Sequence, residues 1–372
     1  MNWMVGLTIS VTYLPVVIFF AFTPYLTRKT EQFGVGIPEA VYDHPEVAQL
    51  RKRYRNRNLL SGSLFAVLFV LGNVWATNMT MTILLPSGLI GQIVLGFTFY
   101  FQGHRKMRQL KSVHQWGQDQ TAVIVVDTRF RTGKVAVSPW WFLAFGVIII
   151  LTWLLGYGLF DRMPNRVPLH YNYLGQVDQW GIKSWKLIYF APVMQLLISI
   201  LMVFVYWIIG QSKQQVDPDN PEQSVVQNQV FRLRWSAFIV FVGMALLLVF
   251  TWMQATFLGL VKTRWMIIGV PLLVGGLIVV AALVLAVTTG QGGSRLRFSQ
   301  SKNGKLINRD EDRFWKLGMF YYNPDDPAIF VEKRFGIGWT NNFAQPLSWL
   351  WLLGSVVVLP LAIIAVNQLL TR

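Results

Sequence analysis

The chain contains no cysteine, which excludes disulfides, thiolate metal sites, cysteine nucleophiles and lipid attachment through Cys. Charged side chains are also scarce. They make up 13% of the 372 residues, against about 25% in an average soluble domain. Hydrophobic residues account for 53%. Such a chain cannot cover a soluble surface with polar groups, so the composition predicts a membrane protein.

Long apolar runs recur along the sequence, each near the length of about 20 residues that crosses roughly 30 Å of hydrocarbon. All 17 acidic residues lie outside these runs, and Lys186 is the one basic residue at an edge. Continuous runs indicate helices rather than barrel strands. We predict an all-α integral membrane protein with eight transmembrane helices, the first a retained helix and not a cleaved signal. The runs lie at 3–26, 59–77, 83–101, 139–160, 185–209, 235–258, 265–289 and 347–369.

The net charge of +16 is unevenly distributed. Most of the 33 Lys and Arg residues fall in 27–58, 102–138, 210–234 and 290–346. The positive-inside rule predicts that these connections are cytoplasmic and that both termini lie outside a bacterial cell membrane. An anionic inner leaflet attracts each nearby cation by about 1 kcal/mol. Lipid therefore explains the charge, and nucleic acid is not needed as a partner.

Polar residues inside the runs are few: Asn73, Gln92, Gln195 and Gln254. We expect these amides to hydrogen-bond between helices, and the lack of ionisable groups argues against a proton-coupled pump. Two cytoplasmic stretches predict a small β element. One is "TAVIVVDTRFRTGKVAV" at 121–137, and the other contains the hairpin signal Asn303-Gly304.

A charged and aromatic segment at 310–343 precedes the last run. We expect it to lie at the inner membrane surface, with its aromatic rings, including Phe320, Tyr321 and Phe330, in the interface and Lys316, Lys333 and Arg334 on headgroups. Asn323-Pro324-Asp325-Asp326-Pro327 predicts a turn and no metal site. "FGIGWT" at 335–340 echoes "FGVGIP" at 33–38, which leaves open whether the two loops pack together. The candidate residues here are Trp315, Tyr322, Asn323, Pro324, Asp325, Pro327, Arg334, Phe335, Gly336, Gly338, Trp339 and Asn342.

The external connection "MPNRVPLHYNYLGQVDQWGIKS", 163–184, holds a second group of candidates. Pro164 and Pro168 predict an extended backbone where the chain leaves the preceding helix. Asn172, Gly175 and Asp178 predict a turn after it. His170 could act as an acid or base with Asp178 or Asp161. No Ser or Thr nucleophile lies between 161 and 183, and no paired-His metal spacing occurs, so we predict a ligand-binding loop and no enzyme. The candidate residues are Pro168, His170, Tyr171, Asn172, Gly175, Asp178, Trp180 and Lys183.

The same residues match a family pattern. Pro168, His170, Tyr171, Asn172, Gly175, Asp178 and Lys183 resemble the P-x-H-[YFW]-N-x-x-G-x-x-D-x-x-x-x-K signature of a bacterial domain in SdpI-like immunity membrane proteins. The resemblance implies protection against a secreted toxic peptide and signalling of its presence. "FWKLGMFYYNPDDP" and "VEKRFGIGWTNNF" resemble a second segment that accompanies the first in longer eight-helix Gram-positive membrane proteins. This chain is longer than the immunity protein, and the shared part is one loop with its flanking helices.

These observations predict a sensing or immunity protein whose ligand is an extracellular peptide or an envelope stress. Its partners would be the lipid bilayer and a cytoplasmic regulator, and no cofactor is expected. A membrane transporter or lipid-handling protein is the alternative, because prolines within the runs predict kinked helices. The predicted regions are 1–138, 139–209 with the SdpI-like loop, 210–289, 290–346 and 347–372.

Overall fold

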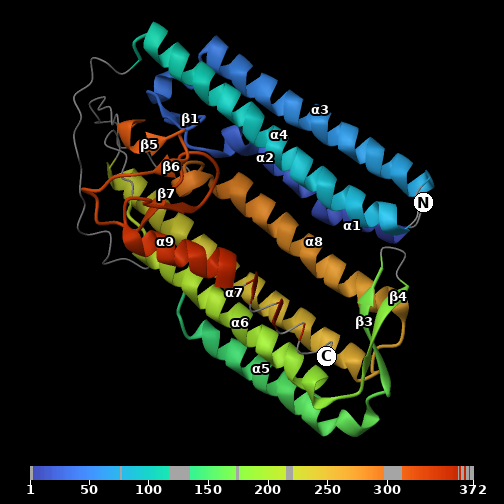
Figure 1. Cartoon of the computed structure of the whole chain (residues 1–372). Helices are drawn as coiled ribbons and strands as arrows, with labels where there is room; N and C mark the ends of the chain where they lie inside the picture. Colours follow the sequence, from blue (N-terminus) through green and yellow to red (C-terminus); the bar gives the residue numbers. More distant parts are fainter. Residues whose placement is uncertain are drawn as a thin grey trace.

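The computed structural model describes residues 3–75, 78–116, 135–172, 176–214, 221–296 and 312–358, together with 360, 361, 364, 365 and 368. Long helices lying side by side dominate the described part (Figure 1). Helices α1 and α2 follow each other along one line, and the break between them at Tyr13 precedes Pro15, which cannot donate a helix hydrogen bond. The helices are α1 (Trp3–Thr12), α2 (Leu14–Leu26), α3 (Pro45–Trp75), α4 (Asn78–Val113), α5 (Trp141–Gly158), α6 (Trp185–Gln211), α7 (Pro221–Phe257), α8 (Arg264–Thr289) and α9 (Pro346–Leu353).

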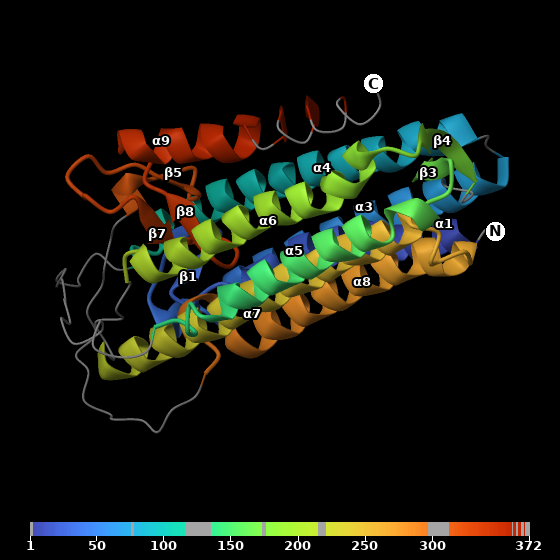
Figure 2. The same cartoon turned by 90° about the horizontal axis from the view of Figure 1, so that it is seen from below.

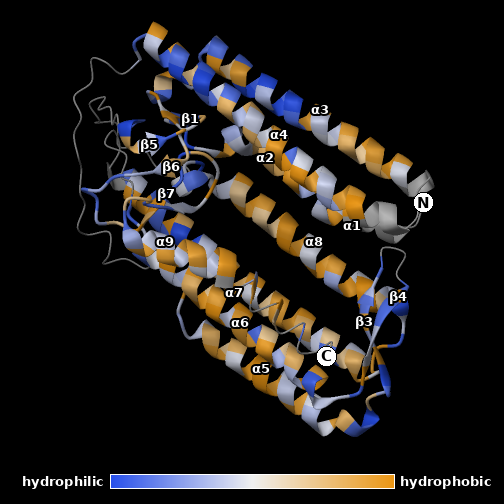
Figure 3. Cartoon of the chain, in the orientation of Figure 1, coloured by the Kyte–Doolittle hydropathy of each residue, from blue (hydrophilic) through white to orange (hydrophobic). Residues whose placement is uncertain are grey.

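Six stretches of the described chain are long and apolar enough to cross a membrane. They are Ile9–Leu26, Ile83–Val113, Trp141–Gly158, Trp185–Gln211, Gln223–Phe257 and Arg264–Gly293. Figure 3 shows hydrophobic residues along most of these helices. The run at 59–77 falls in α3, which packs along α4, and the run at 347–369 contains the shorter apolar helix Pro346–Val357. A helical multi-pass membrane protein is therefore confirmed, and the seventh and eighth crossings stay predictions.

Two of the buried apolar clusters lie within groups of three helices. Tyr13, Val17, Phe69 and Leu85 pack where α2, α3 and α4 meet. Phe145, Met202, Val240 and Leu247 pack where α5, α6 and α7 meet. Helix α8 contacts α7 in the second group and α1 and α2 in the first, so it joins the two.

Buried amides lie between the helices, as predicted for two of the four. Gln195 Nε2 of α6 donates to Thr152 Oγ1 of α5 and to Leu247 O of α7, at 3.0 and 2.8 Å. Ser61 Oγ of α3 donates to Gln92 Oε1 of α4 at 3.0 Å. Gln254 is fully buried, but neither of its side-chain polar atoms has a partner among the described residues. The side chain of Asn73 lies outside the described part.

Short antiparallel strand pairs occupy the two ends of the bundle. β3 (Arg166–Tyr171) pairs with β4 (Val177–Ile182) at the end where α1 begins, which we call the hairpin end (Figures 1 and 2). The opposite end, which we call the basic end, holds β1 (Glu31–Gln32) with β2 (Val35–Gly36), β5 (Trp315–Lys316) with β6 (Phe320–Tyr321), and β7 (Phe330–Glu332) with β8 (Trp339–Asn341). These are not the residues from which we predicted a β element. The predicted stretches fall mostly in 117–134 and 297–311, outside the described residues.

Candidate functional site

The β3–β4 hairpin connects α5 to α6, and one buried side chain anchors it. Val167 of β3 is fully buried and packs in a cluster with Leu187 and Ile188 of α6 and Phe257 of α7. Pro168 lies opposite Trp180, and the register shifts on either side of His170. The extended entry was predicted correctly, whereas the second strand, Val177–Ile182, was not foreseen. The hairpin therefore rests on the ends of α6 and α7.

His170 and Asp178 form an exposed pair on this hairpin. His170 Nδ1 lies 2.6 Å from Asp178 Oδ1, and the two side chains are 63% and 44% exposed. Asp178 therefore belongs to β4 and holds His170, instead of forming the turn as predicted. Asp161, the other candidate orienter, accepts a hydrogen bond from Lys183 Nζ through its main-chain carbonyl at 3.0 Å. The pair can offer a hydrogen-bonding and charged contact to a ligand in water.

The turn of the hairpin is closed by Asn172, as predicted. Its backbone N–H donates to Gln176 O, and its Oδ1 accepts from the Gln176 N–H, both at 2.8 Å. Gly175 lies outside the described residues. At the base of the hairpin, the Lys183 N–H donates to Asn165 O at 3.0 Å, so Lys183 fastens the two strands. Asn172 and Lys183 therefore shape the hairpin.

One face of the hairpin is exposed in the described part of the chain. Asp178, Trp180 and Ile182 alternate along β4 and are all exposed. Ile182, which we did not single out in the sequence, is 80% exposed. Tyr171 is half-buried, and this burial raises the pKa of its hydroxyl. The nearby charge of Arg264 of α8 offsets part of that increase. The hairpin thus offers a mixed aromatic, aliphatic and charged surface.

The second candidate segment folds as part of a compact structure at the basic end. We call this structure the cap, and it consists of residues 27–44 and 312–345. Trp315, Tyr321 and Phe330 are buried inside it. Our prediction that these rings lie in the membrane interface was wrong, because Trp315 and Tyr321 pack against each other inside the cap, and Phe330 packs against Phe204 and Trp207 of α6. Arg334 is buried as well and does not reach headgroups.

The predicted turn at 323–327 is confirmed. Asn323 Oδ1 accepts from the Asp325 N–H at 3.0 Å, and the Asp326 N–H donates to Asn323 O at 3.3 Å. Pro324, Asp325 and Pro327 are exposed on its surface. Asn342 holds the turn from behind, since its Nδ2 donates to Asn323 O and Asp326 O, both at 2.9 Å. The described residues contain no group of three His, Cys, Asp or Glu that could hold a metal ion.

Asp326 ties this turn to the end of α6. Its Oδ2 accepts from Lys213 Nζ at 2.6 Å and from Tyr321 Oη at 2.8 Å. Burial alone would raise the pKa of Asp326, but these donors and the Ala328 N–H hold it below the usual carboxyl value. The charged form is therefore the one that stabilises the cap.

A fully buried carboxylate, Glu332 of β7, lies at the centre of the cap. It pairs with Arg28 from the first connection, and Asn228 Nδ2 of α7 donates to its Oε1. Arg232 of α7 lies 3.9 Å away and is also fully buried. Arg232 in turn donates to Ile209 O and Ser212 O at the end of α6, at 2.8 and 2.9 Å. The sequence analysis missed this network, because its members are far apart in the chain and each looks like an ordinary loop charge.

A second acid, Asp312, joins the cap to α4. It pairs with Arg334, accepts from Lys111 Nζ at 2.7 Å, and accepts from the Gly36 N–H at 3.0 Å. Burial alone would raise the pKa of Asp312, but Arg334 and Lys111 hold it below the usual value. Asp312, Asp326 and Glu332 therefore each join the cap to a different helix at the basic end, namely α4, α6 and α7.

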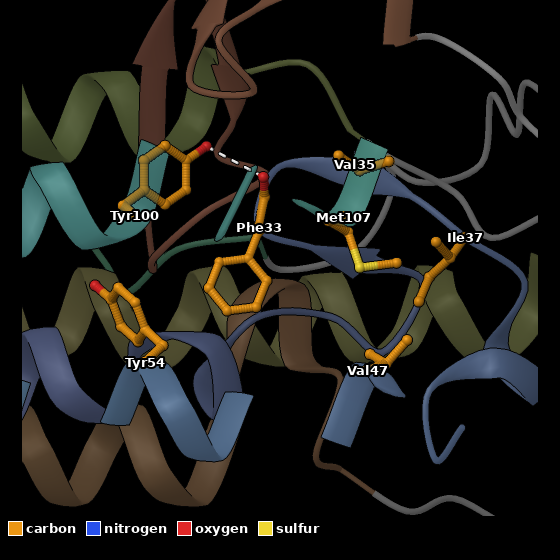
Figure 4. Close-up of a cluster of buried hydrophobic side chains, with 7 residues drawn as sticks. All are labelled: Phe33, Val35, Ile37, Val47, Tyr54, Tyr100 and Met107. Atoms are coloured by element: carbon orange, nitrogen blue, oxygen red, sulfur yellow. Dashed lines mark hydrogen bonds between the residues drawn. The ribbon is translucent and has the colours of Figure 1, made fainter. Parts of the chain in front are cut away.

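The two echoed loops pack together. The Phe33 and Phe335 rings are stacked with centroids 6.2 Å apart, and Phe335 also lies 4.1 Å from Tyr100 of α4. Figure 4 shows Phe33 in its buried cluster, with Tyr100 donating to its carbonyl. Gly34 has a φ of 75° and contacts Gly318 so closely that a side chain there would overlap the backbone.

The last candidates position the β7–β8 hairpin. Gly336 and Gly338 have φ of 91° and 105°, a region of backbone conformation that glycine adopts without steric cost. Gly338 exchanges two hydrogen bonds with the side chain of Gln291, which follows α8, at 3.0 and 2.7 Å. Trp339 packs beside Phe231 of α7, with ring centroids 5.2 Å apart. Tyr322 is exposed.

These features define a multi-pass helical membrane protein with an exposed hairpin at one end and a folded cap at the other. A domain of unknown function, DUF1648, matches residues 147–196, which span most of α5, the hairpin and the start of α6. A family of unknown function, DUF5808, matches residues 324–349, from the cap turn to the start of α9. Comparison with curated proteins and with solved structures found no match. The two matches are compatible with an uncharacterised multi-pass membrane family and coincide with the two candidate segments.

Proposed function

We propose that the chain is an SdpI-like protein of the bacterial cell membrane that senses, or gives immunity to, an extracellular antimicrobial peptide or envelope stress. In this proposal the basic end is cytoplasmic, both termini are outside, and all eight apolar runs cross the membrane. The chain binds and signals without catalysis and without a cofactor. The hairpin takes the external ligand, and the cap meets a cytoplasmic regulator.

The continuous connection from the hairpin to the cap supports this proposal best. Helix α6 begins three residues after β4, and its last carbonyls accept hydrogen bonds from Arg232. Helix α7 packs under Val167 at one end and holds Glu332 through Asn228 at the other. A ligand that moves the hairpin can therefore shift two helices whose far ends hold the cap. Such coupling requires two arrangements of the hairpin and these helices, and a ligand that binds one of them more tightly than the other.

The test is complementation of a strain that lacks the gene, challenged with a panel of envelope-active peptides. The wild-type chain should restore resistance, whereas Trp180→Ala should lose it, because a central aromatic contact costs about 2 kcal/mol, or about thirty-fold in affinity. Leu143→Ala, which removes an exposed apolar side chain of α5 far from the hairpin, is the matched control. Unchanged sensitivity of the deletion strain across the panel would refute the proposal.

A membrane transporter or lipid-handling protein remains the second candidate, and Gln254 is the observation that favours it. Gln254 belongs to α7, and its buried amide lies next to Gly156 of α5. Neither polar atom of this amide has a partner among the described residues. If it served only packing, Gln254→Leu should raise thermal stability and keep resistance, since an unpaired buried amide is unfavourable. If it contacted a transported solute or lipid, the same variant should lose function with its stability intact.

A further inference from the structure

An apolar strip on the outside of the cap is exposed in the part of the chain that the structure describes. Leu317 and Phe320 of the β5–β6 hairpin are 55% and 43% exposed, and Tyr322 is exposed on the same side as Phe320. The strip continues to α9, because the Phe343 ring lies 5.6 Å from that of Phe320 and 5.5 Å from that of Trp349. A contiguous exposed patch of this kind marks an interaction surface.

The position of the strip along the helices can be fixed from two sides. On one side, Tyr100 Oη donates to Leu317 O at 2.9 Å, and Tyr100 lies at the end of the apolar run of α4, just before Arg105 and Lys106. On the other side, Trp351 of α9 stacks on Phe204, with centroids 4.2 Å apart. Phe204 is seven residues before the end of α6, or about 10 Å along the helix axis. The strip therefore lies where the helices leave their apolar stretches.

The residue types of the strip suit the boundary between lipid and water. Trp and Tyr side chains are enriched at headgroup level because their rings are apolar and also carry a polar group that can reach water. Exposed cations flank the strip, since Lys316 lies opposite Phe320 in the strand pair and Arg313 precedes it. These positions are suited to phosphate groups of an anionic leaflet.

We propose that this strip, Leu317, Phe320, Tyr322, Phe343 and Trp349, is inserted into the headgroup layer of the leaflet at the basic end. The bilayer is its occupant because Trp349 of the strip belongs to α9, whose apolar side chains Leu347, Leu350 and Leu353 are exposed as well. The cap thus binds lipid through a few outer residues, while its inner rings pack against protein. This surface is independent of the sensing function, and its test does not need the ligand.

The absence of cysteine allows single labels without background. Phe320→Cys and Tyr322→Cys would each carry a spin label in the full chain, reconstituted in nanodiscs of phosphatidylcholine with phosphatidylglycerol. Leu64→Cys, exposed on the apolar part of α3, is the lipid control. Asp325→Cys, exposed on the cap turn, is the water control. The measurement is the collision rate of each label with oxygen and with a water-soluble nickel chelate.

Oxygen partitions into lipid and the nickel chelate into water, so the ratio of the two collision rates reports the depth of a label in the bilayer. At 320 and 322 the oxygen-to-chelate ratio should be severalfold higher than at 325. The depth of these two labels should lie between the depths at 64 and 325. If both labels match the one at 325 in folded protein, the strip faces water or another protein, and the proposal is overturned. The melting temperature of each labelled variant shows whether the cap has kept its fold.

Discussion

A single arginine joins three elements of this protein. Arg232 projects from α7, holds the last carbonyls of α6 and lies beside Glu332 of β7. Its Nε donates to Asn228 Oδ1 at 2.7 Å, which orients that amide toward Glu332. Because the guanidinium is planar and always charged, it can satisfy several acceptors at once. A lysine could supply the charge but not this set of hydrogen bonds.

Replacing this arginine should therefore be costly. Arg232→Met removes the donor to Ile209 O and Ser212 O and one positive charge beside Glu332, which keeps Arg28 and Asn228 as partners. Breaking a buried pair costs about 3 to 5 kcal/mol. Arg234→Met, two positions along the same helix and exposed, should cost less than about 1 kcal/mol. The measurement is thermal unfolding of the purified variants in the same detergent. Equal melting temperatures for the two would show that the buried network contributes nothing.

At the scale of elements, the hairpin is a short strand pair that needs support. An isolated two-stranded hairpin is marginal in water, and here Val167 supplies the buried contact with α6 and α7. Val167→Ala should destabilise the hairpin by about 1 to 2 kcal/mol. Faster hydrogen exchange in 166–182, with α5 to α7 unchanged, is the expected result. Ile182→Ala, on the exposed face, should leave exchange as it is, and an equal effect of both would contradict the anchoring role.

The elements differ in how far the sequence predicts them. Local chemistry sufficed for the turn at Asn323 and the closure by Asn172, since each rests on a side chain bonding to nearby backbone. It failed for Glu332 and Arg232, which meet only after distant segments have folded. It also failed for Trp315 and Tyr321, because an aromatic segment can hide its rings against protein as well as in lipid. The sequence offered both Asp178 and Asp161 as partners of His170, and the register of the two strands decides for Asp178.

At the scale of the whole molecule, the cap connects helix ends that are far apart in the sequence. Asp312 meets α4, Asp326 meets the end of α6, and Glu332 meets α7 and the first connection. Gln291 ties the end of α8 to the same structure through Gly338. Both helix groups are thus held together at the basic end. The charge of the cap acids maintains this arrangement.

The cap should therefore loosen in acid. The pKa values of Asp312 and Asp326 are lowered in the folded protein, so each contributes stability that is present above the ordinary carboxyl pKa and is lost as pH falls through the lowered value. Hydrogen exchange of residues 312–345 should be constant from about pH 7 to 5 and, after correction for intrinsic rates, faster below about pH 4. Asp326→Asn should weaken the cap at neutral pH and reduce this dependence. Asp325→Asn, on the exposed part of the same turn, should change neither. Protection that stays constant down to about pH 3 would mean that these carboxylates do not hold the helix ends together.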